Sequence, residues 1–256
     1  MNVVVNPGTA PTGPAELLAT WEAGLPLGAA EKSLLLHRAA RPGAATDALL
    51  SVPVGEREAD LFALRRSLFG ERMQVRTECG ACGEAMEFDL DAGALGARPA
   101  AEHRLLCVAE DDWVVEFRLP TVADLAAAGA AASPAEARRR LVTGCTVRAL
   151  RAGESVAAER LAALLPERVE RLIAERAAEA DPTAEVTLHV ACPECGEATP
   201  AELDITSYLW TELDNWARDL LVDVHLLATA YGWSEPHILA LSPLRRRYYL
   251  ELCTDG

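Results

Sequence analysis

Apolar positions near the C-terminal end of the chain recur at helical spacing. Between residues 207 and 231 the apolar residues are three or four positions apart, and charged or amide residues lie between them. The apolar members are Leu209, Leu213, Trp216, Leu220, Val224, Leu227 and Tyr231. A repeat of this period places them along one face, so we predict a long amphipathic helix over residues 207–231. The stripe fits two roles, a face buried in the protein's own core and a coiled-coil seam for a partner helix.

The first quarter of the chain carries shorter helical patterns. Residues 1–14 are rich in Pro, Gly and Thr and are expected to form a loose arm. Beyond it, four segments bounded by Gly or Pro carry apolar residues at helical intervals. The expected helices are one that begins at Pro14 and three more over residues 29–39, 45–50 and 54–69.

Two short motifs interrupt these patterns and share the form Cys-x-x-Cys-Gly-Glu. The first contains Cys79 and Cys82, and the second contains Cys192 and Cys195. The two inner residues of such a motif place both sulfurs on one side of a tight turn, and the Gly relieves the crowded backbone. Residues typical of strands flank each motif, so each is expected to be the tip of a hairpin. Four thiolates form the closed tetrahedral set of one structural Zn²⁺ ion and leave no open position for a catalytic water.

The two motifs are far apart for a single site. Cys192 follows Cys82 by 110 positions, whereas a compact four-Cys site has about 15–20 residues between its pairs. One shared zinc ion therefore requires a large insertion between the halves of a zinc ribbon. Two alternatives stay open: a thioredoxin-like redox pair, although neither motif opens a helix after a strand, and a site that has lost its metal or binds another. His189, just before Cys192, is a further candidate metal group, although a surface His is the simpler interpretation.

The segment between the motifs mixes strand and helix patterns. Two β-rich runs, residues 104–108 and 113–119, surround an acidic turn and predict a hairpin. Capping signatures at Thr121 and Ser133 predict the starts of two helices. The later expected elements are a strand over residues 145–150 and helices over residues 157–165 and 167–180.

These elements together predict an α+β fold. It is mainly helical, with a split four-Cys zinc ribbon of two β-hairpins and a mixed α/β insertion between the two motifs. The expected segments are residues 1–14 as an arm, 15–70 as an N-terminal helical layer, 71–91 and 184–204 as the ribbon, 92–183 as the insertion and 205–256 as a C-terminal helical unit.

Charge and cysteine content narrow the functional classes. The chain has 24 basic and 39 acidic residues, and its net charge of −15 opposes binding to nucleic acid or to anionic membranes. No stretch approaches the roughly 20 apolar residues of a membrane span, and no signal-peptide pattern opens the chain. Cys107, Cys145 and Cys253 have apolar neighbours and are expected to be buried free thiols. Free thiols suit a reducing compartment, so a cytoplasmic protein that binds other proteins is expected.

No catalytic signature is present, so neither enzymatic activity nor a small-molecule substrate is expected. Aromatic residues accompany an Arg triplet in the C-terminal quarter, a combination that is enriched at protein interfaces. The candidate partner-binding residues are Trp216, Tyr231, Trp233, Arg245, Arg246, Arg247, Tyr248 and Tyr249. Three consecutive side chains fan over about 200° on a helix, so a solvated face is the alternative.

Several segments, taken in order, carry a resemblance to a known family. The C-terminal quarter reads Tyr-Gly-Trp-Ser-Glu from Tyr231, Ile-Leu-Ala-Leu-Ser from Ile238 and Arg-Arg-Arg-Tyr-Tyr-Leu from Arg245. Upstream, Val-Gly-Glu-Arg-Glu-Ala-Asp-Leu begins at Val54, and Phe-Arg-Leu-Pro-Thr begins at Phe117. With both cysteine motifs, these segments resemble the T-even-type phage baseplate hub assembly proteins of contractile injection systems and phage-like tails.

The resemblance implies assembly work. Such proteins help to build the hub or wedge of a contractile tail baseplate, and some are chaperones that are absent from the finished particle. The implied partners are hub, spike or wedge proteins of the same particle, and the implied location is the cytoplasm or the assembled particle. Two other functions stay open: a zinc-ribbon regulator that binds nucleic acid, which the net charge opposes, and a thiol oxidoreductase that uses one of the cysteine pairs.

Overall fold

The computed structural model describes residues 13–95 and 105–254, so most of the predicted N-terminal arm lies outside the described residues. The chain divides into two compact units. The helical unit consists of Met1–Pro42 and Ile205–Gly256, and the ribbon unit consists of Gly43–Asp204. The two ends of the chain therefore build one unit, and the middle builds the other. The predicted division into five kinds of segment stays a prediction.

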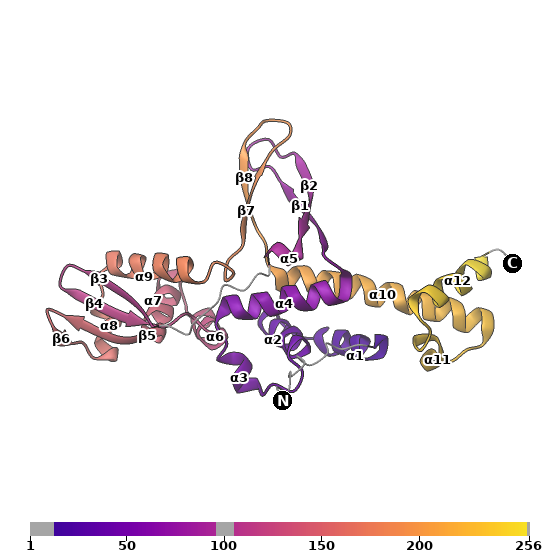
Figure 1. Cartoon of the computed structure of the whole chain (residues 1–256), viewed down its shortest axis with the longest axis horizontal. Helices are drawn as coiled ribbons and strands as arrows, with labels where there is room; N and C mark the ends of the chain where they lie inside the picture. Colours follow the sequence, from indigo (N-terminus) through magenta and orange to yellow (C-terminus); the bar gives the residue numbers. More distant parts are fainter. Residues whose placement is uncertain (1–12, 96–104, 255–256) are drawn as a thin grey trace, which may run out of the picture. The chain divides into compact units, whose positions relative to one another are not determined.

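The helical unit is built on its longest helix, α10. Its elements are α1 (Pro14–Gly24), α2 (Ala29–Ala40), α10 (Ile205–Tyr231), α11 (Glu235–Leu239) and α12 (Pro243–Thr254). Helix α10 contacts each of the other four (Figure 1). The predicted long helix is confirmed, and it begins two residues earlier than the apolar repeat indicated.

The apolar stripe of α10 faces the core of the helical unit for most of its length. Leu209, Leu213 and Leu227 are fully buried. Polar contacts join the same helices: the indole Nε1 of Trp21 donates to a carboxylate oxygen of Asp214 at 2.8 Å. Burial of these leucines stabilises the unit, because each fully buried leucine contributes about 1.5–3 kcal/mol. The core-facing interpretation of the stripe is therefore the correct one here.

The ribbon unit contains the remaining helices and all strands of the described residues. Its helices are α3 (Thr46–Leu50), α4 (Val54–Phe69), α5 (Ala92–Leu95), α6 (Val122–Gly129), α7 (Pro134–Cys145), α8 (Ala158–Leu164) and α9 (Glu167–Ala180). Its strands are β1 (Arg72–Glu78), β2 (Ala85–Asp91), β3 (Leu106–Glu110), β4 (Trp113–Phe117), β5 (Thr146–Arg151), β6 (Glu154–Ser155), β7 (Thr187–Ala191) and β8 (Ala198–Glu202).

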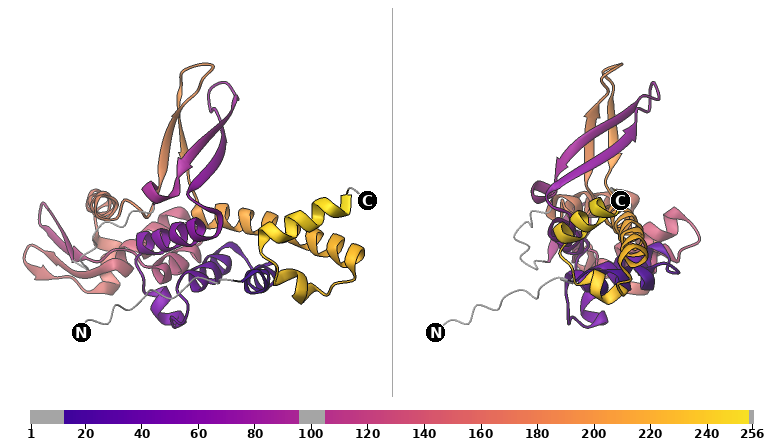
Figure 2. Two further views of the ribbon diagram at one scale, coloured as in Figure 1. Left: turned by 45° about the vertical axis from the view of Figure 1, so that its right-hand side comes forward. Right: turned by 90° about the vertical axis from the view of Figure 1, so that its right-hand side faces the viewer.

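Two separate hairpins carry the cysteine motifs. Strands β1 and β2 pair antiparallel, and so do β7 and β8. The two hairpins lie side by side and point the same way, as the views in Figures 1 and 2 agree. The chain leaves the first hairpin, builds the whole insertion, and returns to build the second.

The insertion has a core of its own. Strands β3, β4, β5 and β6 form an antiparallel sheet in that order. One face of the sheet packs on α8 and α9, where side chains from strands and helices form one cluster. The buried members are Val108, Trp113, Val115, Phe117, Val142, Ala149, Leu161, Leu165, Val169 and Ile173. The fold class is thus confirmed: a mainly helical α+β chain with four cysteines on two hairpins.

Three local predictions need correction. Cys145 ends α7, and the strand that follows is β5, one residue later than predicted. Cys107 is exposed, because side chains alternate along β3 and it is the neighbouring Val108 that faces the core. Cys253 is half-buried, so only Cys145 of the three expected buried thiols is fully buried.

No helix in the described part of the chain is both long and apolar enough to cross a membrane.

Candidate metal centre

The first cysteine motif is a tight turn between β1 and β2. The backbone N–H of Cys79 donates to the carbonyl of Glu84 at 2.8 Å, and the N–H of Gly83 donates back to the carbonyl of Cys79 at 2.9 Å. Gly83 has a φ of 75°, in the left-handed region that glycine adopts without steric cost. The Gly that follows each cysteine pair is therefore required by the backbone of the turn.

The second motif repeats this geometry between β7 and β8. The N–H of Cys192 donates to the carbonyl of Glu197 at 2.9 Å, and the N–H of Gly196 donates to the carbonyl of Cys192 at 2.9 Å. Gly196 also has a φ of 75°. The inner residues differ between the motifs, so the shared Cys-x-x-Cys-Gly spacing accounts for the shared turn.

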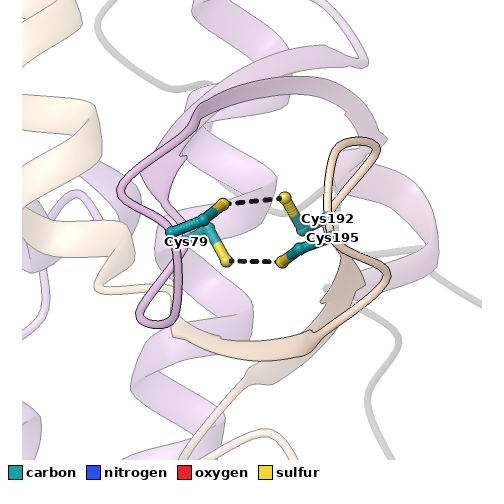
Figure 3. Close-up of side chains that lie close together, drawn as sticks. Cys79, Cys192 and Cys195 are labelled. Carbon is teal, nitrogen blue, oxygen red and sulfur yellow. Dashed lines mark hydrogen bonds between the residues drawn. The ribbon is translucent and has the colours of Figure 1, made fainter.

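All four cysteines meet between the two hairpin tips, and their sulfur atoms lie within 4.8 Å of one another. Each hairpin contributes one sulfur to each of two contacts between the hairpins, drawn as dashed lines in Figure 3: Cys79 Sγ to Cys195 Sγ and Cys82 Sγ to Cys192 Sγ, each 3.6 Å. Zinc–sulfur bonds of about 2.3 Å in a tetrahedron place sulfurs about 3.8 Å apart. A disulfide would bring them to about 2.05 Å. The described arrangement therefore fits one tetrahedrally bound metal ion and no disulfide.

The four ligand positions form two layers. Cys79 and Cys192 are each 3% exposed, whereas Cys82 and Cys195 are exposed. Met86 and Val190 pack against the two inner cysteines and keep water from that side. The cluster leaves no ligand position over for substrate, which agrees with a structural rather than a catalytic ion.

Hydrogen bonds favour the ionised form of Cys79, the buried cysteine of the first hairpin, and this is the form that binds a cation. The backbone N–H groups of Cys82 and Ala81, with the Thr199 hydroxyl, lower the pKa of Cys79 to about 6. Thr199 lies on β8, and its Oγ1 donates to Cys79 Sγ at 3.6 Å, so the second hairpin supports a ligand of the first. The Glu84 N–H lowers the pKa of Cys82, but the neighbouring thiols outweigh it and raise that pKa to about 12. A bound cation would neutralise the repulsion between neighbouring thiolates and so favour the ionised form of all four cysteines.

His189 does not belong to the cluster. It is exposed on β7, and it points away from the face on which Val190 contacts the cysteines. Among the described residues, the grouping of possible metal ligands contains the four cysteines alone. The simpler interpretation of His189, a surface side chain, holds.

The predicted partner-binding residues separate into two groups. Tyr231 stacks on Trp233 with ring centroids 4.7 Å apart, and Tyr249 lies edge-on to Trp233 at 4.9 Å, so these three rings contact one another within the helical unit. Arg246 is also buried, and burial lowers the pKa of its guanidinium, which Asp223 on α10 offsets only in part. The remaining candidates differ in exposure: Arg245, Arg247 and Tyr248 are exposed, and Trp216 is half-buried. A binding role for any of them stays a prediction.

Sequence reasoning did not anticipate a cavity in the ribbon unit. It has a volume of about 550 Å³ and lies against α4, α6, α7 and α9, with a mostly apolar lining that includes Leu125, Val142 and Ile173. Its residues come from segments far apart along the chain, and no local pattern marks them. Asp181, also on its wall, contacts α4.

Comparison with known proteins gives one family match. The model of a family described as T4 bacteriophage base plate protein matches residues 35–207. No curated protein and no solved structure matches the chain. The matched segment includes both cysteine motifs and everything between them, and it stops near the start of α10. The C-terminal motifs that contribute to the resemblance lie outside it.

Proposed function

We propose that this chain, which belongs to the T4 bacteriophage base plate protein family, is a non-enzymatic component or assembly factor of the baseplate of a phage-tail-like contractile injection system. The family match over residues 35–207 carries the proposal, because it covers most of the chain and both cysteine motifs. Family membership indicates a baseplate protein. The assembly role and the hub, spike or wedge proteins as partners are the finer part of the proposal.

The proposed role of the metal is structural. A Zn²⁺ ion held by Cys79, Cys82, Cys192 and Cys195 would join the two hairpins that flank the insertion along the chain. Binding of a structural ion contributes directly to folding free energy, because the unfolded chain has no preformed site. The ion would thereby hold the tips of the two hairpins together and make the ribbon one rigid element, which suits a protein that positions other proteins.

The ribbon surface does not favour nucleic acid. Arg72 on β1 makes two hydrogen bonds, of 2.6 and 2.8 Å, to the carboxylate of Asp89 on β2. Arg76 on β1 donates one hydrogen bond from Nε to a carboxylate oxygen of Glu87 on β2 at 3.0 Å. These cations are matched by acids on the same hairpin, so they offer little to a phosphate backbone, and the net charge of −15 adds repulsion.

The decisive experiment counts this protein in assembled particles. Contractile particles would be purified from the producing cell, and the protein would be quantified by mass spectrometry against sheath and hub subunits. A fixed ratio identifies a resident baseplate component. Abundance in the lysate, absence from particles and a stable complex with a hub, spike or wedge protein identify an assembly factor. Absence from particles together with no binding to any co-encoded tail protein overturns the proposal.

A further inference from the structure

Helix α12 exposes an apolar stripe and buries a charge. Leu244, Tyr248 and Leu252 recur every fourth residue on one side of the helix, and their side chains are 62–64% exposed. Arg246, on the opposite side, is 6% exposed, and its Nε and Nη1 atoms have no hydrogen-bond partner among the described residues. A surface helix normally has the reverse arrangement. Single exposed apolar side chains are common, but three in register on one helix indicate a surface that a partner covers.

Helix α10 exposes a second, shorter stripe. Val222 and Leu226 are 56% and 44% exposed, and they lie on one side of the helix, away from the buried leucines. Asp219, also exposed, precedes Val222 by three positions and shares this side. The stripe therefore has an acidic residue followed by two apolar residues, at positions i, i+3 and i+7.

The exposed side of α12 also carries a charged residue followed by two apolar residues at the same spacing, but its charge is positive. Arg245 is exposed and is followed by Tyr248 and Leu252 at i+3 and i+7. This alternation of three and four residues is the spacing of successive seam positions in a coiled coil. Two helices laid parallel in this register would place the Arg245 guanidinium opposite an acid and the two apolar side chains opposite apolar side chains. The layers would be Arg245 with Asp219, Tyr248 with Val222, and Leu252 with Leu226.

We infer that α12 of one copy of this chain pairs in parallel with α10 of a second copy. The exposed charges favour this occupant, because Arg245 on α12 and Asp219 on α10 have opposite signs and each precedes two apolar residues at the same spacing. The helices as a whole have the same bias: α12 carries three arginines, one of them buried, and one described acid, whereas α10 carries four acids and one arginine. The net charge of −15 on each copy opposes association. Most of this repulsion is between charges far apart on the two copies, and salt screens such interactions because the Debye length is about 8 Å at physiological ionic strength. The contact pair Arg245–Asp219 acts at closer range.

The geometry allows the contact to form without unfolding the helical unit. The side of α12 that carries Arg246 faces its own α10, so the opposite side, with the apolar stripe, stays available. In a two-fold symmetric dimer the contact would form twice, which doubles the apolar area removed from water. The inference concerns the helical unit alone and does not depend on the proposed baseplate function.

Sedimentation equilibrium of the whole metal-loaded protein over a range of micromolar concentrations tests the inference. The weight-average mass of the wild type should rise with concentration. Leu226→Ser or Leu252→Ser should raise the dissociation constant about tenfold or more, as expected when an apolar interface contact is replaced by a polar side chain. Leu221→Ser is the matched control: it changes another exposed leucine of α10 that lies off the stripe, and it should leave association unchanged.

Charge exchange between two copies gives the sharper test. Arg245→Glu and Asp219→Arg should each weaken self-association, whereas a mixture of the two single variants should restore it, because both contacts in the mixed pair then join opposite charges. Arg247→Glu, off the stripe, controls for the change in net charge. Circular dichroism would verify that each variant keeps its helix content. A wild type that stays monomeric, a mixture that fails to restore association, or a stripe that binds only a different tail protein would overturn the inference.

Discussion

The carboxylate of Asp181 accepts a hydrogen bond from the backbone N–H of Gly55 at 2.9 Å, although 126 positions separate the two residues. Asp181 follows the end of α9, and Gly55 lies in the first turn of α4. The residue that precedes α4, Pro53, makes no side-chain capping bond. Asp181 therefore caps the N-terminal end of α4 from the far end of the insertion and ties the two segments together.

Loss of this cap should destabilise the ribbon unit. Asp181→Ala would leave a buried N–H without a partner and should lower the free energy of unfolding by about 1–2 kcal/mol. Asp181→Asn keeps an acceptor oxygen, and burial raises the pKa of the native carboxyl, which shows that its charge is disfavoured there. This variant should therefore lose less stability than Asp181→Ala. Urea unfolding followed by circular dichroism at neutral pH measures both. Equal stability of Asp181→Ala and the wild type would contradict the capping role.

Gly55 should tolerate no side chain, because a Cβ at this position would overlap the Asp181 carboxylate. Gly55→Ala should displace the cap and cost at least as much as Asp181→Ala. Gly129→Ala is the matched control, since no atom lies within 4 Å of the added Cβ and the backbone is compatible with alanine. The same urea titration should show Gly129→Ala near the wild type. The double variant Gly55→Ala with Asp181→Ala should recover part of the loss, because the overlap is gone.

Removal of the metal should unfold the ribbon. The purified protein is expected to contain one zinc ion per chain by inductively coupled plasma mass spectrometry. Cys79→Ser or Cys192→Ser should abolish binding and lower the melting temperature, since both are buried ligand positions. Cys107→Ser changes an exposed cysteine outside the cluster and should leave metal content and melting unchanged. A fully folded wild type without metal would refute the structural role of the ion.

The two glycines of the first motif should respond differently to substitution. Gly83 has a φ of 75°, whereas Gly80 does not have a positive φ, and an added Cβ would meet no atom within 4 Å at either position. Gly83→Ala should therefore lower stability by about 1–2 kcal/mol through backbone strain alone, and Gly80→Ala should change it little. Melting curves of the zinc-loaded proteins distinguish the two. Similar melting temperatures for the two variants would mean that the turn is set by the metal and not by its backbone.

The cluster of four cysteines was predictable because the geometry of each half is local. Each Cys-x-x-Cys-Gly motif specifies its own turn, down to matching hydrogen bonds at Cys79 and Cys192. The long apolar repeat likewise specifies α10, since a period of three and four residues has one helical solution. The joining of the two motifs rested on the chemistry of four thiolates, which is independent of the distance along the chain.

The remaining features depend on contacts that no local pattern encodes. Asp181 follows a helix and precedes a Pro, and nothing around it indicates that it caps a helix 126 positions earlier. The triplet that contains Arg246 reads as uniform charge, yet packing on α10 buries this residue and exposes its two neighbours. Cys107 has apolar neighbours and is nevertheless exposed, because the alternation of β3 turns Val108 to the core.

The stability of the ribbon unit should depend on pH through the carboxylate of Asp124, which lies in the insertion. Burial by itself raises the pKa of Asp124, but hydrogen bonds from Arg118 and from Thr121 lower it to about 2, against 3.8 without these contacts. Arg118 donates from Nη1 and Nη2 to the two carboxylate oxygens at 2.5 and 2.9 Å, and the Thr121 backbone N–H donates at 2.8 Å. Asp124 thereby links the first turn of α6 to Arg118, the residue that follows β4.

Because the folded pKa lies below the unfolded one, the ionised carboxylate stabilises the fold above about pH 4, and this contribution is lost as the pH falls toward about 2. Asp124→Asn should therefore be less stable than the wild type at neutral pH, and the difference should shrink as the pH falls through this window. Denaturant unfolding of both proteins at a series of pH values measures this difference in stability. Release of metal at low pH affects both proteins alike, so it cancels in the difference. Arg118→Gln should flatten the same dependence, because it removes the main partner that lowers the pKa. A difference between wild type and Asp124→Asn that stays constant with pH would show that the carboxylate acts through its shape and not its charge.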